Sequence, residues 1–137
     1  MRVMVIIEGA PAWEAGEPPD ASLLTAMDTY DEELVRAGVM LDGERLQPSS
    51  KGVRVGFAGA TRTVTDGPFT EAADIVTGYW LWQVRSIDEA IEWAKRCPTP
   101  MAEGSVLEIR AVLDPDGSGS DPTPSPVQRR ARRTSKD

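Results

Sequence analysis

The stretch Gly78–Val84 reads GYWLWQV and is the most aromatic run in the chain. Successive side chains of a β-strand point to opposite faces. One face of this strand therefore carries both tryptophans, and the other carries a tyrosine and a leucine. The first set is Trp80, Trp82 and Val84, and the second set is Tyr79, Leu81 and Gln83. Large side chains on both faces predict a sheet that has to be covered on both sides.

The segments around this strand show clear periodicity. Arg2–Glu8 is apolar on both faces, which is typical of a buried strand. In residues 21–37, apolar residues at spacings of four, three and four predict a helix that Gly38 ends in a left-handed cap. These helix residues are Leu23, Met27, Tyr30 and Leu34, flanked by Leu24 and Val35.

The remaining segments alternate between strands and one further helix. Val39–Leu46 resembles a short strand interrupted by an Asp42-Gly43 turn, and two strands at 53–57 and 61–65 form a hairpin. Ser86 and Glu89 form a capping box, so a helix begins there and ends before Pro98. That helix is expected to bury Ile87, Ala90, Ile91 and Ala94. The last expected strand is 105–113.

This order of elements predicts an α+β fold with a ferredoxin-like β-α-β-β-α-β plan and an extra hairpin strand, over residues 1–113. Two helices cover one face of such an antiparallel sheet. The second face is too apolar to lie against water, and a second copy related by two-fold symmetry is the simplest cover. We therefore expect a homodimer through the second sheet face, which is a dimeric α+β barrel.

Composition excludes several kinds of site. The chain has 137 residues, a net charge of −7 and no histidine, so catalysis by a Ser-His-Asp triad and histidine-ligated zinc are excluded within one chain. The acidic charge disfavours direct nucleic-acid binding by the folded core. Cys97, the one cysteine, is interpreted as a small apolar filler. No metal, no cofactor, no membrane span and a cytoplasmic location are expected.

Residues 114–137 differ in composition from the rest of the chain. They are rich in Pro, Gly, Ser and Asp, and they end in the basic run QRRARRTSK. Such a segment cannot bury enough apolar area to offset its ordering entropy, so a disordered tail is predicted. The basic end is either a solubilising tail or a contact for an acidic partner or nucleic acid.

The run VTDGPFTE, at Val64–Glu71, allows two interpretations. As a turn, Asp-Gly ends a strand, Pro68 prevents its continuation and Phe69 fills the core. As a site, Asp66 is a candidate catalytic acid or base at the mouth of an apolar pocket. Candidate substrate-binding residues are then Phe69, Glu71, Tyr79, Trp80 and Trp82.

Other aromatic and basic residues are also open to two interpretations. Trp80 and Trp82 are either core or dimer-interface rings, or an aromatic wall for a flat ligand. Trp13, in the loop 9–20, is a candidate lid over the same cleft. The strand arginines either pair with surface carboxylates or bind an anionic ligand. These residues are Arg54, Arg62 and Arg110.

The run at 64–71, together with the glycine-aromatic strand that follows it, resembles the DGPF subgroup of YCII-related proteins. The resemblance covers about residues 1–112 and includes MRVMVIIEG, WEAGEP, RAGVMLDGERLQP, SIDEAIEWAKRCP and GSVLEIRAV. It implies a ferredoxin-like dimeric α+β barrel in a small cytoplasmic bacterial protein. The wider family is suspected of enzymatic activity because of a His-Asp pair, of which only Asp66 has a counterpart here.

Two functional hypotheses follow. The first is a dimeric small-molecule-binding domain, with a possible weak acid/base activity at Asp66. The second is a non-enzymatic regulatory module, because the resemblance implies association with an extracytoplasmic-function sigma factor. The ligand and the reaction are not fixed by the sequence.

Overall fold

The computed structural model describes residues 1–9, 14–15, 21–69, 75–98 and 104–113. The elements in chain order are β1 (Arg2–Glu8), α2 (Ala21–Arg36), β2 (Met40–Arg45), the short 3-10 helix η1 (Ser49–Lys51), β3 (Val53–Ala58), β4 (Thr61–Asp66), β5 (Val76–Gln83), α3 (Ile87–Lys95) and β6 (Val106–Ala111). The predicted tail and Trp13 lie outside the described residues. No helix among these elements is long and apolar enough to cross a membrane.

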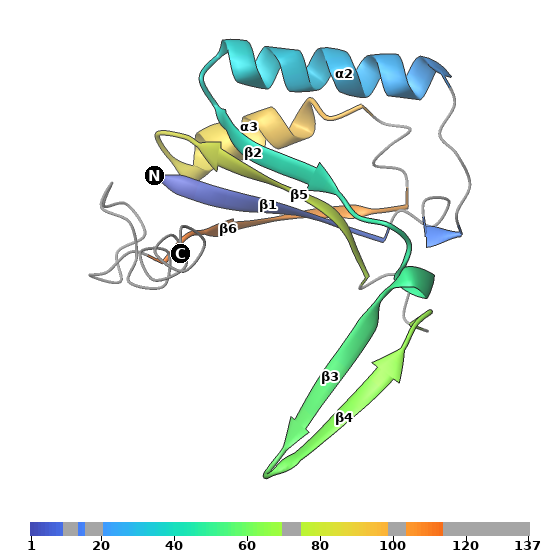
Figure 1. Ribbon diagram of the computed structural model, residues 1–137. Helices are drawn as coiled ribbons and strands as arrows, with labels where there is room; N and C mark the ends of the chain where they lie inside the picture. The colour runs from blue at the N-terminus through green and yellow to red at the C-terminus, as the bar shows by residue number, and fades with distance from the viewer. Residues whose placement is uncertain (10–13, 16–20, 70–74, 99–103, 114–137) are drawn as a thin grey trace, which may run out of the picture.

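Four strands form the main sheet, in the order β2-β5-β1-β6, and every neighbouring pair is antiparallel. Helices α2 and α3 lie on one face of this sheet, as Figure 1 shows. With the hairpin left aside, β1-α2-β2-β5-α3-β6 is the β-α-β-β-α-β order, so the ferredoxin-like prediction is confirmed.

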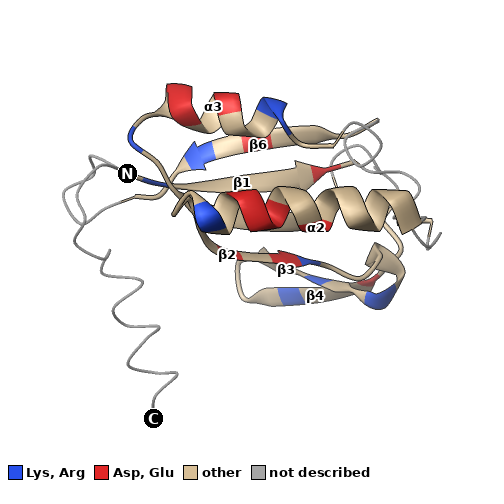
Figure 2. Cartoon of the chain, turned by 90° about the horizontal axis from the view of Figure 1, so that it is seen from above, with Lys and Arg blue, Asp and Glu red and all other residues tan. Residues whose placement is uncertain are grey.

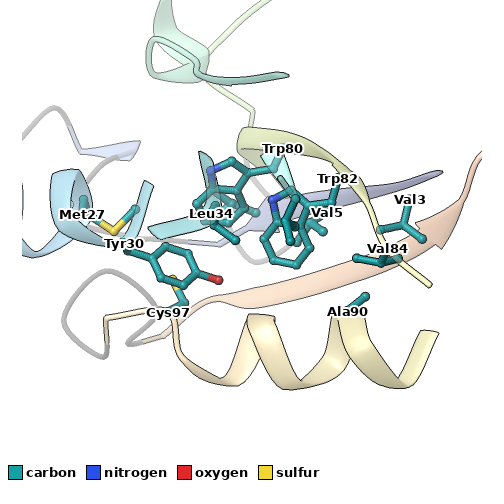
Figure 3. Packing of buried hydrophobic residues seen from close by; sticks show 12 residues of the cluster. Val3, Val5, Met27, Tyr30, Leu34, Trp80, Trp82, Val84, Ala90 and Cys97 are labelled. Carbon is teal, nitrogen blue, oxygen red and sulfur yellow. The ribbon is translucent and has the colours of Figure 1, made fainter. Parts of the chain in front are cut away.

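The core lies between the main sheet and the two helices (Figure 3). Val3, Val5 and Ile7 of β1 face the helices, beside Trp80 and Trp82 of β5, and each of them is at most 1% exposed. Helix α2 adds Met27, Tyr30 and Leu34, and α3 adds Ala90. The predicted division of GYWLWQV into two faces is therefore correct.

Trp80 occupies the centre of the aromatic part of this core. Its ring lies 5.6 Å from that of Trp82 and 5.7 Å from that of Tyr30, centroid to centroid. Its indole Nε1 donates a hydrogen bond of 3.1 Å to Asp31 of α2, and the Arg45 guanidinium lies 4.7 Å from the ring centroid. Among the described residues, by contrast, the buried Nε1 of Trp82 has no hydrogen-bond partner.

The predicted turn at Asp42-Gly43 is wrong, because β2 runs through it as a strand. Gly43 pairs with Trp80 across the sheet. A Cβ at this position would lie 2.7 Å from Cδ1 of Trp80. The glycine therefore makes room for the indole and does not mark a reversal of the chain.

The helix ends agree with the sequence in most details. Gly38 has a φ of +75° after α2, as a left-handed cap requires. Ser86 caps α3 by accepting a hydrogen bond from the backbone N–H of Glu89, and the Glu89 carboxylate in turn accepts from Arg85 N–H. Ile87 and Ile91 were expected to be buried, but they are 38% and 36% exposed because the short helix turns them toward its outer edge.

The second face of the main sheet is not covered by any of the described helices or strands. Met4 is 37% exposed there, and Ile6, Tyr79 and Leu81 are half-buried. We call this surface the free sheet face. Its apolar character is as predicted, and its burial by a second copy stays a prediction.

The hairpin of β3 and β4 forms a two-stranded sheet of its own, so it does not add a strand to the main sheet. In Figure 1 it projects away from the helices, on the side of the free sheet face. All twelve residues of its strands are exposed.

The two tryptophans give a matched stability test. Trp80→Phe removes a hydrogen bond to Asp31 and a contact with Arg45, whereas Trp82→Phe removes a donor that has no partner. We expect Trp80→Phe to cost about 1 kcal/mol more of unfolding free energy than Trp82→Phe. Urea unfolding of both variants checks this, and an equal or larger cost for Trp82→Phe contradicts it.

Cys97 is buried in the core cluster, which confirms its interpretation as an apolar filler. Burial raises the pKa of its thiol from 9.0 to about 11, with Arg45 acting in the opposite direction. The folded state therefore keeps a proton that the unfolded state releases above pH 9.0. We expect the free energy of unfolding to fall as pH rises from about 9 to about 11, and to fall less steeply in Cys97→Ala. Urea titrations across this range measure both slopes.

Candidate functional site

The run around Asp66 forms a hydrogen-bonded corner with two other segments. Ser49, at the start of η1, is 7% exposed. Its hydroxyl donates to the Glu14 carboxylate and accepts from Phe69 N–H at 3.1 Å, while its backbone N–H donates to Glu14 at 2.9 Å. The residues Glu14, Ser49 and 67–69, which we call the corner, thus connect the loop after β1, η1 and the end of the hairpin.

Gly67 is required by the close packing of this corner. Its N–H donates to the Gly52 carbonyl at 3.0 Å, and the peptide bond between Gly67 and Pro68 is cis. A Cβ at Gly67 would lie 1.8 Å from the carbonyl oxygen of Ser49. The geometry thus matches the interpretation of this run as a strand-ending turn.

Asp66 lies at the end of β4, opposite Val53, and its side chain is exposed. Phe69 is half-buried, and the Arg54 guanidinium lies 3.8 Å from its ring centroid. Phe69 therefore packs on the hairpin and on η1, outside the main core. Glu71 lies outside the described residues.

The other candidate residues lie on opposite faces of the main sheet. Trp80 and Trp82 are both 0% exposed beneath the helices, so neither indole contributes to a surface of the described chain. Tyr79 points to the free sheet face, because it alternates with Trp80 along β5 and pairs with Ile6 of β1. The structure therefore does not bring Tyr79 together with the two tryptophans.

Tyr79 has a partner that the sequence analysis missed. Its hydroxyl donates to the carboxylate of Asp42 at 3.4 Å, and Glu44 is the cross-strand neighbour of Tyr79. The negative charge of Asp42 raises the pKa of the Tyr79 hydroxyl, and desolvation and Glu44 act in the same direction. Strand alternation through residues 39–46 would have placed Asp42 on the same face as Tyr79. The Asp-Gly pair predicts a turn instead, and a residue in a turn is not assigned to a face of the sheet.

The Tyr79–Asp42 pair borders the apolar part of the free sheet face. Cross-strand pairing places Leu81 between Met4 of β1 and Asp42 of β2. A protonated phenol is a donor and a carboxylate is an acceptor. This margin of the sheet can therefore bind a molecule that offers an acceptor beside a donor, with an apolar body on the sheet.

The other features of the described residues do not indicate a binding or catalytic site. An open, shallow hollow lies along α2, and its lining is mostly acidic: Asp28, Asp31, Glu32, Val35 and Arg36. No group of three or more acidic or cysteine side chains in the described part of the chain is arranged to hold a metal ion. Arg110 pairs with Glu108 on β6 at 3.7 Å, which agrees with a surface ion pair.

The corner gives a matched pair of glycine variants. Gly67→Ala places a methyl group against the Ser49 carbonyl and should cost about 2 kcal/mol or more of unfolding free energy. Gly52→Ala places one in the same corner, at an ordinary 3.5 Å from the same carbonyl oxygen, and should change stability by less than about 1 kcal/mol. Thermal unfolding compares the two, and equal effects contradict the packing described for Gly67.

Comparison with known proteins finds a matching family model, a similar sequence and a similar solved structure. A family model described as the YCII-related domain matches residues 1–115. Uncharacterized protein R00369 of Rhizobium meliloti (strain 1021) is 27% identical over 101 residues, which are 74% of this chain and 80% of that protein. The solved structure of 5-chloro-2-hydroxyhydroquinone dehydrochlorinase (TftG) from Burkholderia phenoliruptrix AC1100, in complex with 2,5-dihydroxybenzoquinone, has a TM-score of 0.48 and 15% identity, covering 83% of this chain and 95% of that one. Since the family model spans most of its length, the chain belongs to the YCII-related family.

Proposed function

We propose that this YCII-related protein is a homodimeric domain that binds a small molecule on the free sheet face, beside Tyr79 and Asp42. The observation that carries the proposal is the pairing of a donor and an acceptor at the margin of an exposed apolar surface. The ligand class is a small molecule with an apolar body and adjacent hydrogen-bond acceptor and donor groups, such as a hydroxyketone or an amide.

The electrostatics of the pair favour this role. A tyrosine phenol carries its proton at neutral pH and is a donor there. The negative charge of Asp42 raises the pKa of Tyr79 and so extends that range to higher pH. Its hydrogen bond to Asp42 is long, at 3.4 Å, so the proton can be redirected to a ligand oxygen. The Asp42 carboxylate is then available to accept a hydrogen bond from the ligand.

The homodimer supplies the cover that the ligand needs. The free sheet face holds Met4, Ile6 and Leu81 without any element of the same chain above them. A second copy packed by two-fold symmetry buries this surface, at about 25 cal/mol for each Å² of apolar area. It also encloses a molecule bound beside Tyr79, which excludes water from the hydrogen bonds.

An acid/base activity at Asp66 remains a proposal with less support. Its carboxylate is exposed at the end of β4. The sigma-factor module has no observation in its favour in the described part of the chain. We therefore place the ligand at Tyr79 and Asp42, and keep Asp66 as the comparison in the test.

Ligand-observed NMR with a library of hydroxyketones and amides tests this function. We expect bound compounds to lose at least about tenfold in affinity in Tyr79→Phe and in Asp42→Asn, because the first variant removes the phenol donor and the second replaces a charged acceptor by a neutral, weaker one. Asp28→Asn, an exposed change on α2, is the matched control and should leave the affinity unchanged.

Asp66→Asn separates the two candidate positions. Asp66 is exposed, so this variant should leave stability within about 0.5 kcal/mol of the wild type. If ligand affinity falls in Asp66→Asn and is kept in Tyr79→Phe, the site lies at the end of β4 and the proposal for Tyr79 is wrong.

A further inference from the structure

The β3–β4 hairpin has one apolar face, and that face contacts nothing in its own chain's core. Cross-strand pairs place Val55 opposite Val64 and Phe57 opposite Arg62 on this face. Its large apolar side chains are Val53, Val55, Phe57 and Val64, which are 60%, 52%, 73% and 67% exposed. The core cluster contains none of them.

The other face of the hairpin is different in character. Small and polar residues occupy it: Arg54, Gly56, Ala58, Thr61, Thr63 and Thr65. The hairpin is therefore an amphipathic ribbon and not a uniformly solvated loop. A two-stranded hairpin alone is at best marginally stable in water, and three or more strands or a packed face are needed for stability. An apolar face of this kind thus indicates that another body covers it.

The described elements of the chain do not offer a suitable cover. The helices and the core lie on the other side of the main sheet from the hairpin (Figure 1). Residues 114–137 include a single large aliphatic residue, Val127, so this segment has little apolar surface to place on the hairpin. None of the described helices and strands therefore covers the apolar face of the hairpin.

We infer that the β3–β4 hairpin is an arm that lies across a second copy of the chain, with its apolar face against that copy. This inference rests on the homodimer of the proposed function. It adds that the β3–β4 hairpin packs against the second copy. The arm projects on the side of the free sheet face, which is the side where a second copy packs (Figure 1). In a two-fold dimer each copy gives one arm and receives one.

The size of the surfaces supports this arrangement. With strand spacings of about 4.8 Å and about 3.3 Å per residue, the free sheet face projects roughly 20 by 20 Å, or about 400 Å². A stable interface usually takes about 800 Å² of accessible surface from each partner. The arm, roughly 20 by 10 Å by the same spacings, enlarges the apolar contact by about half.

One charged residue of the apolar face can meet an acidic margin on a second copy. Cross-strand pairing places Arg62 and Asp66 on the apolar face, whereas Arg54 lies on the other face and contacts the Phe69 ring. On the free sheet face, the β2 margin carries Asp42 and Glu44, and Figure 2 shows acidic residues on β2. Arg62 can therefore pair with this margin on a second copy, while the apolar side chains provide most of the contact.

Two substitutions on opposite faces of the arm test the inference. Phe57→Glu puts a charge on the apolar face, where Phe57 is 73% exposed in the single chain. Thr63→Glu puts the same charge on the polar face, opposite Gly56, the residue next to Phe57. Sedimentation equilibrium gives the dimer dissociation constant of each. We expect at least about a tenfold increase for Phe57→Glu, and less than about threefold for Thr63→Glu.

The possible outcomes distinguish a failure of the inference about the hairpin from a failure of the proposed homodimer. A wild-type chain that stays dimeric, with Phe57→Glu no weaker than Thr63→Glu, overturns the arm and leaves the proposed function in place. A wild-type chain that sediments as a monomer overturns both. If the NMR screen finds no ligand for the wild-type chain, but Phe57→Glu still weakens the dimer, the proposed ligand site is wrong and the arm is retained.

Photocrosslinking tests the same contact without relying on Phe57→Glu, which could weaken the dimer by unfolding the hairpin. Phe57 is replaced by p-benzoylphenylalanine, which keeps an aromatic side chain, and isotope-labelled and unlabelled chains are mixed before irradiation. We expect crosslinked peptides that join a labelled to an unlabelled chain and map to β1, β2 or β5. Crosslinks found only within one chain, or only to other proteins in a lysate, overturn the inference.

Discussion

The position of the Trp80 indole constrains most of the structure. It lies between the main sheet and α2, it is fixed by a hydrogen bond to Asp31, and it packs on Tyr30 and Trp82. The strand next to it must approach closely, which is possible only because residue 43 is a glycine. The edge strand β2 is thus held in register by a ring on its neighbour. That register in turn places Asp42 beside Tyr79 on the opposite face.

The fold was largely predictable because the apolar periodicities are strong and the elements are short. Arg2–Glu8 and the face assignment of Trp80 and Trp82 agree with the structure, as does the capping by Ser86. The failures share one physical origin, which is that a local signal was overruled by a tertiary contact. Asp-Gly is a frequent turn pair, yet Gly43 serves the packing of an indole instead. Likewise, helical spacing alone does not show how far a nine-residue helix covers Ile87 and Ile91.

The candidate site was less predictable than the fold. Residues adjacent in sequence, such as Tyr79 and Trp80, were grouped, but strand alternation separates them by the thickness of the sheet. The residues that do come together, Tyr79 with Asp42 and Ser49 with Glu14, are 37 and 35 positions apart. The periodicity of a single segment shows which face a residue lies on, but it does not show which residue of a distant segment lies beside it. The run at Asp66 gave a correct family and a correct turn, while its chemistry depends on distant neighbours.

The corner built on Ser49 has a kinetic consequence for the dimer proposed above. Both strands of the hairpin leave from this corner, since β3 follows η1 directly and β4 ends at Asp66. The hydrogen bonds that Ser49 makes with Glu14 and with the Phe69 N–H fix the base of the hairpin when the chain folds. The conformational entropy of orienting the hairpin is therefore lost when the chain folds and not when two chains meet. A rigid, pre-oriented projection of this kind lowers the entropic cost of each encounter, and it favours fast and geometrically specific assembly.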